Sequence, residues 1–157
     1  MKKIETEGWT VKAVKSMEHN KGLFYSGNLY RGARKVATFV EHGCGGPMSI
    51  EYCDDDAKSD FLSLSNFVQG DVHTESDVVM IAEMVDQYEH VKRIRRDRKK
   101  KTYFSIEEHD DTTEYAINTP YSKQAVAVIL QNKGDITIAN EEFDIYPDGV
   151  ERVYRDE

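Results

Sequence analysis

The stretch GLFYSGNLYRGARKVATFVE, residues 22–41, decides the fold expected for this chain. Its first half alternates between two faces of a strand, with Leu23, Tyr25 and Leu29 on one face and Phe24 and Tyr30 on the other. This two-residue period is typical of β-structure. A glycine-containing connection follows at residues 31–34, and residues 35–41 form a second apolar run. The stretch therefore predicts a β-hairpin.

Similar patterns flank the hairpin on both sides. Before it, Trp9, Val11 and Ala13 alternate with the residues between them, which predicts a strand. After it, the loop at residues 42–47 carries three glycines and a proline, which interrupt a strand. Alternation resumes at residues 48–52. The first fifty residues thus predict a four-stranded antiparallel meander.

The hydrophobic period changes after the three aspartates at residues 54–56. Ala57, Phe61, Leu64 and Val68 recur at helical spacing, and Gly70 follows as a stop. A longer helix is expected to begin near Thr74, and its apolar stripe comprises Val78, Ile81, Met84, Val85, Tyr88 and Val91. These two segments predict two central helices.

The last third predicts a second hairpin and a C-terminal helix. Residues 101–107 and 112–119 read as strands around His109-Asp110-Asp111. A helix over residues 123–132 would bury Ala125, Val128 and Ile129 and stop at Gly134. Beyond Ile138 the pattern is ambiguous, and one possibility is a small hairpin between residues 143–145 and 150–153. We predict an α+β fold in a single domain spanning residues 1–157.

Composition favours a soluble, intracellular protein. The 157 residues carry a net charge of −8, and no window approaches the roughly 18 apolar residues that a membrane helix needs. Two cysteines, Cys44 and Cys53, are too few for a disulfide framework and are expected as free thiols. We therefore expect a cytoplasmic protein without a membrane partner; its oligomeric state is not predicted.

One segment opposes the acidic character of the rest. Residues 92–101 contain one acid and eight basic residues: Lys92, Arg93, Arg95, Arg96, Arg98, Lys99, Lys100 and Lys101. Clustered cations suit a contact with nucleic-acid phosphates or an acidic protein. The alternative is a solvated helix end that pairs with the chain's own carboxylates. Only Tyr103 and Phe104, just downstream, offer rings on which bases would stack.

A second candidate is the loop Gly43, Cys44, Gly45 and Gly46. Glycines permit close approach of a ligand, but the loop is followed by Pro47 and a strand rather than by the Lys-Ser/Thr and helix of a phosphate-binding loop. A structural turn is the simpler interpretation. Cys44 with His42 is weak evidence for a catalytic pair, because such partners normally come from distant segments.

No metal or cofactor site is expected. His42, Cys44 and Cys53 lack a zinc spacing, and His109, Asp110 and Asp111 with the aspartates at 54–56 do not match a calcium loop. The aspartates instead suit a helix cap and a turn.

Several segments resemble a group of small, uncharacterised phage- and bacteria-encoded proteins. The similar segments are GLFYSGNLYRGARKVA at residues 22–37, GCGGP at 43–47, EMVDQYE at 83–89, KKKTYF at 99–104, PYS at 120–122, GD at 134–135 and ANEEF at 139–143. The turn at residues 31–34 departs from the tighter Asp-Gly turn expected there. The resemblance implies a protein of phage or mobile genomes, a class whose members often bind host machinery.

Three functions therefore remain open from sequence. The first is a non-catalytic binding protein, a modulator of a host protein. The second is nucleic-acid binding through residues 92–101. The third is a small-ligand binder or enzyme with a site at the loop of residues 43–47.

Overall fold

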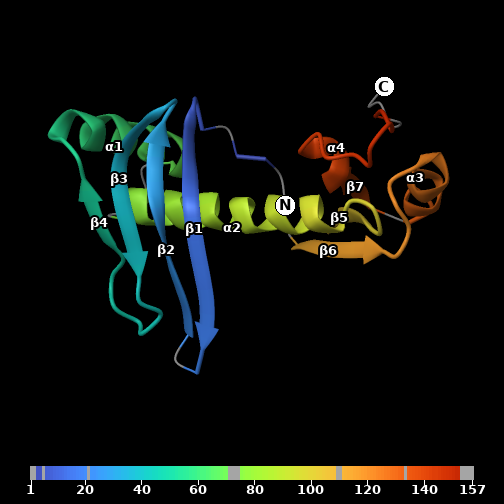
Figure 1. The fold of residues 1–157 in the computed structure, drawn as a ribbon, viewed down its shortest axis with the longest axis horizontal. Helices are drawn as coiled ribbons and strands as arrows, with labels where there is room; N and C mark the ends of the chain where they lie inside the picture. The colour runs from blue at the N-terminus through green and yellow to red at the C-terminus, as the bar shows by residue number, and fades with distance from the viewer. Residues whose placement is uncertain are drawn as a thin grey trace. The chain divides into compact units, whose positions relative to one another are not determined.

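The computed structural model describes residues 3–4, 6–20, 22–70, 75–108, 111–132 and 134–152. The fold is α+β, as predicted, with a four-stranded antiparallel sheet, two central helices, a second antiparallel sheet of three strands and short C-terminal helices (Figure 1). The chain divides into two compact units, residues 4–88 and residues 1–3 with 89–157. The single domain over residues 1–157 stays a prediction.

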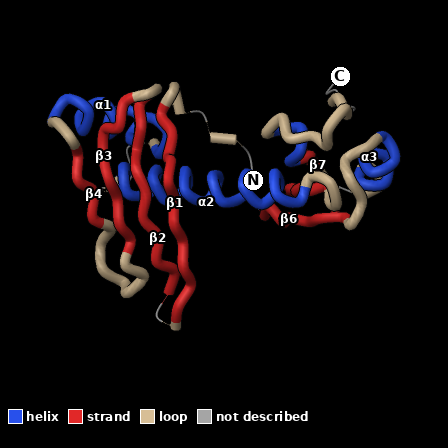
Figure 2. Tube along the Cα trace, in the orientation of Figure 1, coloured by secondary structure: helices blue, strands red, loops and turns tan. Residues whose placement is uncertain are grey.

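The first unit is built on the predicted meander. Its strands are β1 (Trp9–His19), β2 (Gly22–Arg31), β3 (Arg34–Glu41) and β4 (Ser49–Tyr52). Each strand pairs with the next in antiparallel fashion, so the order in space follows the order in sequence (Figure 2). The turn of Gly32 and Ala33 joins β2 to β3, as the opening stretch predicts.

A β-bulge corrects the alternation predicted for β1. The pairing of β1 with β2 shifts between Lys12 and Lys15, so that Ala13 and Val14 both lie opposite Gly27. Ala13 adopts a left-handed φ of 54° and is exposed, whereas Val14 is buried. The extra residue shifts the alternation of side chains along the strand by one position. Val14 therefore occupies the core position that a regular alternation predicts for Ala13.

Helix α1 (Asp55–Gln69) begins and ends where the sequence predicts. The Asp54 carboxylate accepts a hydrogen bond from the Ala57 amide at 2.7 Å, which satisfies one of the free N–H groups of the first turn. Gly70 closes the helix in the left-handed conformation, with φ at 76°.

The inward face of α1 differs from the prediction at one position. Ala57, Phe61 and Leu64 are buried, but Val68 is exposed. Ser65 is buried in its place, and its hydroxyl donates to the Phe61 carbonyl at 2.7 Å. The Ser65 hydroxyl finds its hydrogen-bond partner within the helix, so burying this side chain costs little free energy.

Helix α2 (Ser76–Asp97) completes the core of the first unit. The expected start near Thr74 lies outside the described residues. α1 and the first part of α2 cover one face of the sheet (Figure 1). The core between them includes Trp9, Val11, Val14, Tyr25, Leu29, Val36, Phe39, Phe61, Met80, Ile81, Met84 and Val85.

The second unit contains the predicted hairpin and an additional strand. Strands β5 (Thr102–Glu108) and β6 (Asp111–Ile117) pair as expected, while β7 (Asp135–Ile138) pairs with the other edge of β5. Short helix α4 (Ala139–Glu142) follows β7 directly. Residues 143–152 hold no strand, so the small hairpin suggested for the tail is wrong in that range; Val153 lies outside the described residues.

Helix α3 (Lys123–Ile129) is shorter than predicted and turned differently. Ser122 caps its first turn through the Ala125 amide. Val126 is buried with Ile129, whereas Val128, expected inside, is 54% exposed. The apolar stripe of a seven-residue helix is too short for its phase to be assigned from sequence.

Candidate functional site

The basic segment Lys92–Lys101 covers the end of α2 and the turn that follows it. Five of its cations pair with carboxylates of the same unit, and these pairs are Lys92–Glu89 (3.3 Å), Arg93–Glu114 (3.0 Å), Arg96–Asp97 (3.0 Å), Arg98–Asp148 (3.5 Å) and Lys99–Asp148 (2.9 Å). Internal pairing, the alternative weighed from sequence, therefore accounts for these five side chains.

Three cations of the segment are not neutralised in this way. In the part of the chain that the structure describes, no carboxylate forms an ion pair with Arg95, Lys100 or Lys101. The amides of Lys100 and Lys101 both bond the Asp97 carbonyl, at 2.8 and 3.0 Å, which holds the turn against the helix end. The three positive charges thus gather at one helix terminus.

The surrounding carboxylates are strongly acidic. A hydrogen bond from Arg96 and a second from the Tyr103 hydroxyl lower the pKa of Asp97 to about 2. A hydrogen bond from Lys99, with the charges of Lys99 and Arg98, lowers the pKa of Asp148. Both carboxylates are therefore ionised at neutral pH.

The two rings proposed for base stacking are not available. Tyr103 is 8% exposed and Phe104 is 6% exposed, because both belong to the core of the second unit. The Phe104 ring stacks on Tyr115, with centroids 5.5 Å apart. A ring packed in this way cannot accept a nucleotide base without unfolding its own contacts.

The glycine loop has a structural explanation at its first position. A Cβ on Gly43, whose φ is 63°, would lie 2.8 Å from the backbone carbonyl of Leu23, so the loop packs directly on β2. The Gly43 amide donates to the Glu41 carboxylate at 2.9 Å. Gly45 and Gly46 are exposed, and a Cβ on either would meet nothing within 4 Å.

Cys44, Cys53 and His42 do not form a shared site. Cys44 and Cys53 are both free and exposed, and the Cys44 thiol donates to the His42 carbonyl at 3.3 Å rather than to its ring. Across the described ranges, no group of three or more His, Cys, Asp or Glu side chains is placed to hold a metal ion. His109 and Asp110 lie outside those ranges.

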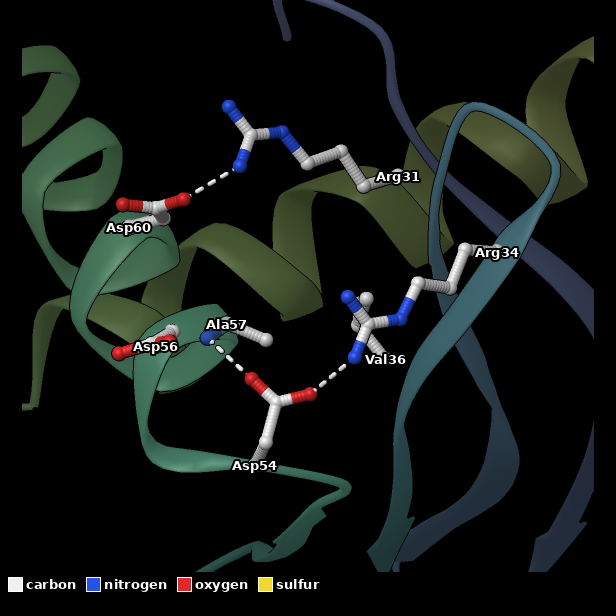
Figure 3. A pocket seen from close by; sticks show the side chains of 7 residues that line it. All are labelled: Arg31, Arg34, Val36, Asp54, Asp56, Ala57 and Asp60. Carbon is white, nitrogen blue, oxygen red and sulfur yellow. Dashed lines mark hydrogen bonds and ion pairs between the residues drawn. The ribbon is translucent and has the colours of Figure 1, made fainter.

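A hollow that the sequence did not indicate lies between the β2–β3 turn and the start of α1. It has a volume of about 380 Å³ and is lined by Arg31, Arg34, Val36, Asp54, Asp56, Ala57 and Asp60. Figure 3 shows the two guanidiniums reaching from the strands toward the helix, where Arg31 pairs with Asp60 and Arg34 with Asp54. Asp54 thus serves both the helix cap and this contact.

A second hollow of about 280 Å³ adjoins the first. It shares Arg31 and Asp60 with it and adds Glu7, Trp9, Ser63, Leu64 and Phe67. The Arg31 guanidinium lies 5.4 Å above the buried Trp9 ring, so a cation–π contact and an ion pair both fix its position. The two hollows lie beside α1 and share Arg31 and Asp60, and we call their combined lining the α1 groove.

One face of α1 forms a wall of the α1 groove. Asp56, Asp60, Ser63 and Phe67 follow at spacings of four, three and four residues, which places them in one stripe of a helix. The spacing of these four residues can be read from the sequence. It is less conspicuous than the apolar stripe of the core, because only Phe67 among the four is apolar. That Arg31 and Arg34 also line the α1 groove cannot be predicted from the sequence, because it depends on how the β2–β3 turn packs against α1.

Two further observations bound the functional classes. No helix in the described residues is long and apolar enough to cross a membrane. Comparisons with protein-family models, with curated proteins and with solved structures find no match to this chain.

Proposed function

We propose that the chain is a non-catalytic binding protein whose α1 groove receives a basic segment of a partner protein, with an apolar side chain of that segment against Phe67. The observation that carries this proposal is Phe67 itself. Its side chain is 83% exposed at the rim of a concave surface, although the neighbouring Trp9 and Leu64 are buried.

An exposed phenylalanine in a groove favours a protein partner. Binding energy at protein interfaces concentrates in a few aromatic and arginine side chains near the centre, surrounded by polar groups. The α1 groove has this composition, because Phe67 and Arg31 lie among Glu7, Asp60 and Ser63. Burying the exposed part of Phe67 would contribute on the order of 2 kcal/mol.

The charge of the groove favours a basic partner. Four acidic and two basic side chains line it, and Arg31 and Arg34 are already paired. Glu7 and Asp56 form no ion pair with any described residue, so two negative charges face solvent. Cations of a partner would meet these two carboxylates and be steered by the acidic surface.

The resemblance to phage- and bacteria-encoded proteins supports a host protein as this partner. A ligand site or enzyme at the loop of residues 43–47 stays a prediction without separate support, since packing on β2 explains Gly43.

Affinity capture from a bacterial lysate with matched variants tests the proposal. We expect wild type to retain a protein that Phe67→Ser loses, because the apolar anchor is removed. Val128→Ser is the control, since Val128 is also exposed but lies on α3. Capture that both variants reduce equally, or that neither reduces, would contradict the groove as the binding surface.

Two double variants with the same change of net charge test whether the partner's binding segment is basic. The double variant E7Q/D56N removes the two unpaired carboxylates of the groove, and we expect weaker capture with a smaller salt dependence. The control E18Q/E51Q makes the same change of net charge at exposed strand positions outside the groove. An equal loss in the control would assign the effect to overall charge.

A further inference from the structure

The end of α2 carries a positive charge that the described carboxylates of the unit do not neutralise. Among the described residues, the eight cations at residues 92–101 have four carboxylate partners, on Glu89, Asp97, Glu114 and Asp148, which leaves an excess of four positive charges. His90 adds none at neutral pH, because burial lowers the pKa of its imidazole. The excess is concentrated in Arg95, Lys100 and Lys101, which form no ion pair with any described residue.

Backbone carbonyls at the end of α2 are already hydrogen-bonded to other groups. Arg98 donates to the Arg95 carbonyl at 3.0 Å, and the amides after the helix bond the Asp97 carbonyl. These contacts satisfy carbonyls that would otherwise attract the lysines. No carboxylate in the described part of the chain forms an ion pair with the ammonium group of Lys100 or of Lys101.

The five internal ion pairs are of a kind that a polyanion can displace. Their cations have side chains between 37% and 73% exposed. Solvent-exposed pairs contribute little to stability and are screened by salt. Asp148 is shared by Arg98 and Lys99, so it leaves one of these two cations uncompensated.

The surface lacks the apolar centre that a protein interface needs. Ile94, Tyr103 and Phe104, the large apolar side chains within and just after the segment, are all buried. Protein interfaces have an apolar core inside a polar rim, whereas contacts to a phosphate backbone are made by charged and polar groups alone. A nucleic acid therefore fits this surface better than an acidic protein does.

We infer that Arg95, Lys100 and Lys101 bind the phosphate backbone of a nucleic acid, as a second binding activity separate from the α1 groove. The contact is independent of base sequence, because the rings of Tyr103 and Phe104, just after the segment, are buried and the cations are gathered at one helix end. Arg98 and Lys99 exchange Asp148 for phosphate when the backbone is bound.

The test measures binding of the full chain to a labelled DNA duplex of about 20 base pairs at several salt concentrations between ~50 and ~200 mM. Five phosphate contacts, three from Arg95, Lys100 and Lys101 and two from Arg98 and Lys99, predict that log K falls against log salt with a slope of about −4.5. The variant R95Q/K100Q/K101Q should reduce the magnitude of that slope by about three, since each lysine or arginine on a phosphate contributes about one.

The control K15Q/K35Q/K58Q makes the same change of net charge with exposed lysines of the first unit that form no ion pair with any described residue. It should bind the duplex as wild type does, and so should Phe67→Ser, which separates this inference from the proposed function. Both triple variants should unfold at the same temperature as wild type, because the altered side chains are exposed or unpaired.

Several results would overturn the inference. One is the absence of duplex binding at ~50 mM salt, where phosphate contacts are strongest. A second is an equal loss in the control triple variant, which would indicate general charge. A third is binding of polyglutamate that is as tight as DNA binding and equally dependent on the three cations, which would assign the surface to an acidic protein.

Discussion

At the scale of single residues, Gly27 shows how the first sheet closes over its core. Gly27 lies opposite the β1 bulge, and the Phe39 ring occupies the space above it. A Cβ at Gly27 would approach the Phe39 Cζ to 2.5 Å, and Phe39 is 1% exposed and cannot move into solvent. The absence of a side chain is what admits the ring.

Replacing Gly27 with alanine is therefore expected to destabilise the protein. Overpacking of this kind costs about 1–3 kcal/mol in free energy of unfolding. Urea denaturation measures it, with Gly46→Ala as the control, because a Cβ at Gly46 meets nothing within 4 Å. A loss of stability no larger than that of the control would contradict the packing described here.

At the bulge residue Ala13, a substitution is instead expected to stabilise the protein. Its φ of 54° disfavours a side chain by about 1–2 kcal/mol, and glycine removes that strain at an entropic cost of roughly 0.5–1 kcal/mol. We expect Ala13→Gly to raise the free energy of unfolding by up to about 1 kcal/mol. A clear decrease in thermal or urea stability would show that Ala13 does not hold the left-handed conformation.

At the scale of elements, Asp54 links α1 to the β2–β3 turn. Its carboxylate accepts the Ala57 amide and pairs with Arg34. Asp54→Ala removes both contacts, and we expect a loss of about 1 kcal/mol or somewhat more. Asp54→Asn keeps a good cap but loses the ion pair, so urea denaturation should show a smaller loss. Equal losses would mean that the cap contributes little.

The carboxylate at the end of α2 allows a prediction about pH. The pKa of Asp97 is lowered to about 2 in the folded chain, first by the hydrogen bond from Arg96 and then by that from Tyr103. A lowered folded-state pKa contributes stability above the unfolded-state pKa, near 3.9, and this contribution is lost as the pH falls toward 2.

Carbon-detected NMR titration measures that pKa directly. Arg96→Gln should raise the titration midpoint of Asp97 toward its ordinary value, and Tyr103→Phe should raise it by less. A midpoint near 4 in the unmodified chain would contradict the contacts described for this helix end.

At the scale of the whole molecule, local patterns predicted the elements and packing decided the exceptions. The alternation in residues 22–41 and the period change after residue 54 predict the meander and the two central helices, which the structure contains. The prediction of which side chains face the core was wrong at Ala13, Val68 and Val128, because a bulge or a helix end changes which side chain points inward. β7 was missed because four residues carry too little periodicity.

The two surfaces differ in how far the sequence predicts them. The basic segment is visible as a run of charge, but only the structure separates the paired cations from Arg95, Lys100 and Lys101. The α1 groove joins residues more than twenty positions apart, such as Arg31 and Asp60, and pairing over that distance requires the fold. A single exposed Phe67 gives no sequence signal, since it looks like any helical apolar residue.

Site-specific photocrosslinking tests whether a partner protein binds in the α1 groove, as proposed. Benzoylphenylalanine replaces Phe67 in one protein and Val128 in another, and both are irradiated in a bacterial lysate. We predict one crosslinked protein at position 67 that is absent at position 128 and is lost in E7Q/D56N but kept in E18Q/E51Q. No crosslink at position 67, or the same crosslinks from both positions, would contradict the account.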